Sequence, residues 1–182
     1  MRPVKFLLII LAGAILAACN FPLSKEAAKK FKSRPGPFSV TVFPIRVVSG
    51  PNAEYDAELG RELLAWLEEK NLASGRVGET VEFPVQWHMD QSKMLKETAA
   101  AFASQVTSMA IETEYAFLAE LLCNRNKTDV GGIHYFLTNA KGEFVSVGLN
   151  NSHWAEYKAV MPKSPVDGVE VVKLMLENNW LE

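Results

Sequence analysis

The stretch FSVTVFPIRVV, from Phe38 to Val48, decides the fold class of this chain. Most of its residues are β-branched or aromatic, and apolar side chains fall on both of its alternating faces. A strand that is apolar on both faces lies in the middle of a sheet that is covered from two sides. The stretch therefore predicts a central strand of an α/β domain.

Hydrophobic periodicity along the rest of the chain predicts three helices and four further strands. In the second helix, apolar residues recur at steps of three and four, as at Leu95, Ala99, Phe102 and Val106. In the weakest strand, Pro84 indicates a sheet edge or a bulge. The expected helices cover residues 53–70, 91–111 and 164–177, and the expected strands cover 80–87, 114–122, 133–138 and 143–149.

These elements follow the order β-α-β-α-β-β-β-α, which predicts one α/β domain of two or three layers with a mixed sheet over residues 38–182. The order, with the segments VTVFPI (40–45) and EYAFLAELL (114–122), resembles the α/β domain of the TolB amino-terminal and CsgG-like periplasmic families. Members of those families are envelope assembly, secretion or enzyme-activating components that contact other proteins. The resemblance covers residues 38–178 and implies a protein-binding domain without catalytic residues.

The first nineteen residues divide into the parts of a secretory signal. The positive segment MRPVK precedes an apolar run at 6–15, which is shorter than the ~20 residues that a spanning helix needs. Small residues then lead to Cys19, and the segment LAAC (16–19) resembles the bacterial lipobox. We expect residues 1–18 to be a lipoprotein signal peptide and Cys19 to carry the acyl chains, such as palmitate. An ordinary secretory signal or an uncleaved anchor are the alternatives.

Residue 20 bears on which membrane holds the anchor. In lipoproteins of diderm bacteria an aspartate at this position commonly signals retention in the inner membrane, whereas this chain has Asn20. The lipobox resemblance therefore implies anchoring at the periplasmic face of the outer membrane.

Charge is distributed unevenly between the start of the mature chain and the rest. Segment 20–35 carries five basic residues and one acidic residue, whereas residues 36–182 carry 12 basic and 20 acidic residues. An acidic domain argues against binding to nucleic acid. We expect residues 19–37 to form a basic tether, which is either simply solvated or touches anionic lipid.

Glu120 and Cys123 are candidates for a chemical role. Glu120 lies within the predicted strand 114–122, and Cys123 follows it directly. Cys123 has no cysteine left to pair with if Cys19 is lipidated, and we expect it to be a small buried hydrophobe. Glu120 interrupts an apolar strand, where a lone carboxylate is costly. Glu120 is either an acid with a raised pKa or, as we favour, the partner of a lysine or arginine.

No catalytic or metal-binding constellation stands out in the sequence. His88, His134 and His153 lie too far apart to form a paired metal-ligand motif. The chain has no nucleophile elbow, phosphate loop or zinc-protease motif. We therefore predict no catalytic residues, no metal and no cofactor.

The best candidate for binding is a cluster in the expected loop at 150–163. Amide, imidazole and aromatic side chains together offer hydrogen bonds and a stacking surface for a sugar or a protein partner. Alternatively, the two aromatic residues fold inward and cap the core. The candidate residues are Asn150, Asn151, His153, Trp154 and Tyr157.

Three functions remain open at this point. The first is a non-enzymatic accessory lipoprotein that contacts an envelope protein, and the second is a lipoprotein that binds a glycan or another small polar molecule at Asn150–Tyr157. The third, an enzyme, requires two of Glu120, His88 and His134 within hydrogen-bond distance in a cleft. We favour the first.

Overall fold

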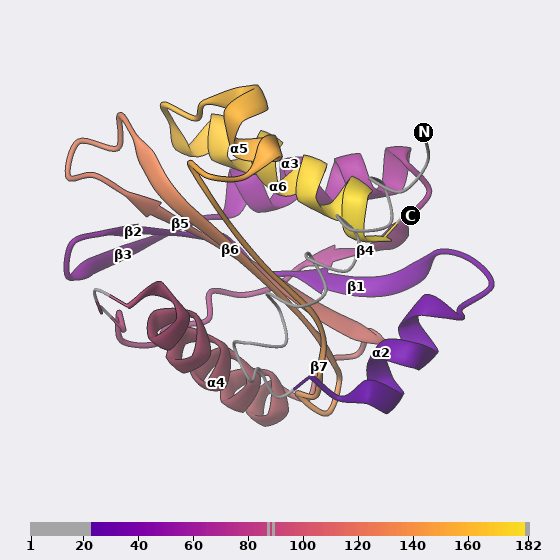
Figure 1. The fold of residues 1–182 in the computed structure, drawn as a ribbon. Helices are drawn as coiled ribbons and strands as arrows, with labels where there is room; N and C mark the ends of the chain where they lie inside the picture. The colour runs from indigo at the N-terminus through magenta and orange to yellow at the C-terminus, as the bar shows by residue number, and fades with distance from the viewer. Residues whose placement is uncertain (1–22, 87, 89, 181–182) are drawn as a thin grey trace, which may run out of the picture.

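The computed structural model describes residues 23–86, 88 and 90–180 and confirms the predicted α/β class. A mixed sheet of seven strands carries helices on both faces (Figure 1). Within the described residues, no helix is both long enough and apolar enough to cross a bilayer. The expected signal peptide, Cys19 and Asn20 lie outside the described residues.

Strand β5 (Tyr115–Cys123) is the centre of the sheet, and all nine of its residues are buried. On one side it pairs in parallel with β1 (Phe38–Val42) and then with β2 (Ile45–Ser49). On the other side it pairs antiparallel with β6 (Val130–Asn139), which pairs with β7 (Phe144–Asn151). The two apolar stretches of the sequence are therefore neighbours in the covered middle of the sheet, as predicted.

The expected strand at 38–48 is divided in two at Phe43 and Pro44. The N–H of Phe43 still donates to the carbonyl of Phe117 at 2.9 Å, whereas proline has no N–H to donate. After β2 the chain turns at Gly50, whose φ is +62°, and returns as β3 (Asn52–Asp56) along the outer side of β2. The expected helix at 53–70 is therefore shorter and begins as α3 (Ala57–Glu69), capped by Asp56.

The expected strand at 80–87 is wrong, because residues 78–86 join no ladder. The strand of this region is β4 (Ala73–Val77), which pairs in parallel with the outer side of β1. A Cβ atom on Gly75 would lie 1.8 Å from the carbonyl oxygen of Val40, so only glycine fits this close approach. The glycine that makes the pairing possible also removes the β-branched pattern that would have predicted the strand.

Helices cover the two faces of the sheet as expected (Figure 1). α3 and α6 (Pro165–Trp180) lie on one face, and α4 (Gln91–Met109) lies on the other. Asp90 caps α4, since its carboxylate accepts from the N–H groups of Ser92 and Lys93. The expected loop at 150–163 is wrong in part, because it contains the end of β7 and the short helix α5 (Ala155–Val160).

The segment expected to be a basic tether is folded onto the domain from Leu23 onward. α2 (Lys25–Lys32) places Phe31 against the rings of Phe38, Tyr115 and Trp180, with ring centroids 5.2–5.5 Å apart and edges facing rings. Phe31 is 3% exposed. The prediction of a separate tether is therefore wrong for this part, because Phe31 and Ala27 on one side of the helix pack against the core.

This docking predicts the effect of Phe31→Ala. We expect the free energy of unfolding to fall by about 3–5 kcal/mol, as for other buried phenylalanine truncations, measured by denaturant titration. Lys32→Ala, one residue along and exposed, is the matched control and should change stability by less than ~0.5 kcal/mol. Equal effects of the two substitutions would show that α2 is not part of the folded unit.

Candidate functional site

Three charged or titratable side chains meet inside the sheet. Arg46 on β2, Glu120 on β5 and His134 on β6 stand opposite one another across neighbouring strands. A guanidinium nitrogen of Arg46 forms an ion pair with Glu120, and Nδ1 of His134 lies 3.0 Å from the other carboxylate oxygen. Each of the three is at most 1% exposed. We call this group the buried triad.

The buried triad also fixes the irregular segment 78–86 on the α4 face of the sheet. Nη2 of Arg46 donates to the carbonyl of Phe83 at 3.1 Å, and the guanidinium lies 4.2 Å from the centroid of the Phe83 ring. The predicted pairing of Glu120 with a cation is confirmed. Glu120 and His134 are within hydrogen-bond distance, as an enzyme would require, but both side chains are at most 1% exposed, so the carboxylate does not open on a cleft.

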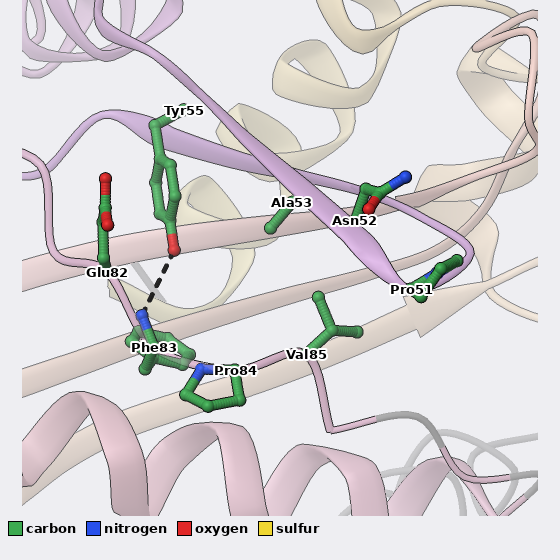
Figure 2. A pocket seen from close by; sticks show the side chains of 8 residues that line it. All are labelled: Pro51, Asn52, Ala53, Tyr55, Glu82, Phe83, Pro84 and Val85. Carbon is green, nitrogen blue, oxygen red and sulfur yellow. Dashed lines mark hydrogen bonds between the residues drawn. The ribbon is translucent and has the colours of Figure 1, made fainter.

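A surface groove of about 550 Å³ lies between β3 and the segment 82–85, directly outside Phe83 (Figure 2). Figure 2 shows the Tyr55 side chain reaching from β3 to the backbone of Phe83, whose N–H donates to the Tyr55 hydroxyl at 3.4 Å. Phe83 is therefore held by Tyr55 in the groove wall and by Arg46 beneath. The groove is lined by Pro51, Asn52, Ala53, Tyr55, Glu82, Phe83, Pro84 and Val85.

β3 is an edge strand beside this groove. Its one partner in the sheet is β2, so alternate backbone groups along its other side have no ladder partner among the described strands. Two exposed carboxylates flank it, Glu54 on β3 and Glu82 on the groove rim. Glu54 forms an ion pair with Lys127, whereas no ion pair of Glu82 is found in the described part of the chain.

A second depression, of about 350 Å³, lies at the carboxyl end of β5. Its apolar wall includes Leu122 and Cys123, and its polar wall includes His88 and Gln91. Burial raises the pKa of the Cys123 thiol to about 11, so the thiol stays protonated at neutral pH. This confirms that Cys123 is a buried hydrophobe. Nε2 of His88 lies 2.7 Å from a carboxylate oxygen of Glu97.

The residues predicted as a binding cluster are spread over β7, a turn and α5. Asn150 is 2% exposed and donates to Glu156 at 2.9 Å, and Asn151 donates to Gln91 at 3.1 Å. His153 is exposed, Trp154 is half-buried, and Tyr157 packs against the core. None of the five lines either depression, and their binding role stays a prediction.

Sequence reasoning missed Arg46, Tyr55 and Phe83, which build the triad and the groove. One signal was present, because Arg46 and Glu120 are opposite charges in two strands that are otherwise apolar on both faces. Such a pair indicates that the two strands are neighbours. Nothing in the sequence pattern marked Tyr55, because β3 itself was not predicted.

Comparison with known proteins adds little to this geometry. No family model matches the chain, and no curated protein matches it. Among solved structures, the chain is similar to the LpoB C-terminal domain from Salmonella enterica, with a TM-score of 0.40 and 10% identity over 68% of this chain and 90% of that one. A likeness at this level carries no functional argument, and the resemblance to the TolB and CsgG-like families stays a prediction.

The buried triad predicts a large effect of Glu120→Gln. This substitution leaves the Arg46 charge buried without a counter-charge, which should lower the free energy of unfolding by about 3–5 kcal/mol in denaturant titrations. The double variant Arg46→Met with Glu120→Leu removes both charges and should recover most of that loss. A single variant within ~1 kcal/mol of the parent would mean that the carboxylate charge is not needed.

Proposed function

We propose that this chain is a lipid-anchored, non-enzymatic accessory protein of the bacterial cell envelope that works by contact with another protein. The lipobox-like segment at Cys19 supports the anchor, and Asn20 supports the periplasmic face of the outer membrane. The observation that carries the contact is the free edge of β3 beside the groove over Phe83. The occupant we propose for the groove is an extended segment of the partner.

Strand addition suits this edge of the sheet. An extended peptide can pair with the unpaired backbone groups of an edge strand while its side chains enter neighbouring pockets. β3 has five residues, so it matches a peptide segment about 17 Å long. Because exposed Glu82 lines the groove and forms no ion pair among the described residues, the proposed peptide carries a basic residue opposite it.

The same features limit indiscriminate pairing. Edge strands attract other strands, and proteins protect them by keeping them short and by placing prolines and charges along them. β3 is short, Pro51 precedes it, and Glu54 projects beside it. We therefore propose that the edge accepts a peptide of matching charge rather than any extended chain.

A non-enzymatic role agrees with how the reactive side chains are used. Glu120 and His134 are each at most 1% exposed, and the Cys123 thiol is protonated at neutral pH. His88 is paired with Glu97. The alternative of glycan binding at Asn150–Tyr157 has less support, because Asn150 and Tyr157 are occupied by contacts within the domain.

The anchor predicts opposite outcomes for the two cysteines. Cys19→Ser should abolish incorporation of a palmitate analogue and either release the domain from the membrane fraction or leave an unprocessed precursor. Cys123→Ser is the matched control and should label and fractionate like the parent. Normal labelling of the Cys19→Ser variant would overturn the anchor.

The groove predicts a charge-dependent contact. A photo-crosslinking residue at Asn52 in cells should yield one dominant protein adduct, and Glu82→Lys should reduce its yield about tenfold, which corresponds to ~1.4 kcal/mol. Glu69→Lys makes the same charge change on exposed α3, on the other face of the sheet, and should leave the yield unchanged. Equal yields for both variants, or adducts with lipid alone, would refute the groove as the docking site.

A further inference from the structure

α2 presents a stripe of lysines that points away from the domain. Lys25, Lys29 and Lys32 recur at steps of four and three, so they share one side of the helix, opposite the side that buries Phe31. All three are exposed, and within residues 23–180 as described none of them forms an ion pair. Because Phe31 docks the helix, these charges are held in a fixed array.

The chain is fixed to the sheet almost as soon as it leaves the expected anchor. Leu23 forms a β-bridge with Phe144, and the N–H of Ser24 donates to the Phe144 carbonyl at 3.1 Å. Ser24 then caps α2, since its hydroxyl oxygen accepts from the N–H of Ala27 at 3.2 Å. Four residue steps separate Cys19 from Leu23, and these span at most about 14 Å.

The connection from Cys19 to Leu23, called the leash below, is so short that it restricts which part of the domain can reach the bilayer. A domain of about 160 residues has a radius of gyration near ~15 Å, so its far end lies well beyond the leash. The part nearest Leu23, where the described chain begins, consists of α2, the turn between β6 and β7, and the end of α4 (Figure 1). The hydroxyl of Thr107 on α4 donates to the carbonyl of Lys141 in that turn at 3.4 Å, which joins these elements.

The same end exposes further groups that suit a membrane surface. Leu23 and Met109 are two of the few large apolar side chains that the described residues leave exposed, each at 36%. Lys30 and Lys141 line a shallow depression between α2 and the turn. The acidic groups here are Glu26 on α2, Glu112 paired with Arg76, Glu114 beside Ser39, and Glu143, which accepts from Asn139.

We propose that this end of the domain, with the lysine stripe of α2 at its centre, lies flat on the anionic lipid headgroups of the membrane that holds the anchor. The proposal rests on the proposed lipidation of Cys19, because the short leash is what brings α2 to the surface. Lysines within a Debye length of an anionic surface, about 8 Å at physiological salt, are attracted to it.

The rest of the domain strengthens this orientation by repulsion. Residues 36–182 carry 12 basic and 20 acidic residues, so this part of the chain as a whole has a net negative charge that an anionic surface repels. Attraction at α2 and repulsion of the rest of the domain together favour the orientation in which α2 faces the bilayer. The β2–β3 hairpin, at the left of Figure 1, then lies at the end opposite α2, at the lower right, and points away from the bilayer.

The test uses the lipidated protein reconstituted into vesicles. A fluorophore is attached at Ser33→Cys, beside the lysine stripe, or at Asn52→Cys, on the far hairpin, and a nitroxide in the lipid headgroups quenches whichever lies at the surface. Cys123 does not compete for the label, because it is buried and its pKa is raised to about 11. Vesicles are either phosphatidylcholine alone or an equimolar mixture with phosphatidylglycerol.

We expect quenching at position 33 to be several-fold stronger than at position 52 in the anionic vesicles, and to weaken at about 1 M salt, where the Debye length falls to ~3 Å. Changing Lys25, Lys29 and Lys32 together to Glu should abolish the difference. Changing Lys93, Lys96 and Lys158 to Glu alters net charge equally on other exposed surfaces and should preserve it.

The outcomes separate this inference from the anchor itself. Equal quenching at the two positions in the anionic vesicles would refute the orientation. If the same protein floats with phosphatidylcholine vesicles, the anchor is left intact. Protein that fails to float with phosphatidylcholine vesicles would refute the anchor and the inference with it. Preferential quenching at position 33 that survives the triple lysine reversal would show that the leash alone, without the lysines, sets the orientation.

Discussion

The ion pair between Arg46 and Glu120, with His134 on the other side of the carboxylate, is the constraint on which the rest of the domain depends. A buried charge without a partner is costly, so β2, β5 and β6 can align in only one register. A slip of one residue would place Glu120 opposite an apolar side chain and turn every strand residue to the other face. Arg46 also binds the Phe83 carbonyl, and the register of the sheet therefore decides where the groove forms.

The aromatic contacts of Phe31 impose a second constraint, at the other end of the sheet. Its ring meets Phe38 on β1, Tyr115 on β5 and Trp180 at the end of α6, so the first and last helices close over the same strands. Under the proposed lipidation of Cys19, only residues 20–22 would separate the lipid from this locked end of the chain. A domain attached in this way would be held close to any lipid at Cys19.

The sequence was most informative where burial imposes a simple pattern. Phe38–Val48 and the run around Glu120 were predictable as central strands because both of their faces are apolar, and α4 was predictable from its apolar stripe. β3 and β4 were not, since β3 is half-exposed and β4 depends on Gly75 for its close approach to Val40. The candidate site was missed for the same reason, because Tyr55 lies on β3 and Phe83 lies in an irregular segment that joins no strand ladder.

The proposed contact at β3 and the proposed orientation at α2 depend on each other. A five-residue edge strand offers few hydrogen bonds and little apolar area, so a peptide that adds to it from free solution would bind weakly. Two proteins held at one membrane meet at a much higher effective concentration, and a weak contact then suffices. That gain requires the binding edge to face the partner, and a lysine-bearing helix that follows Leu23, itself within about 14 Å of the proposed anchor, is a physical means of orienting that edge.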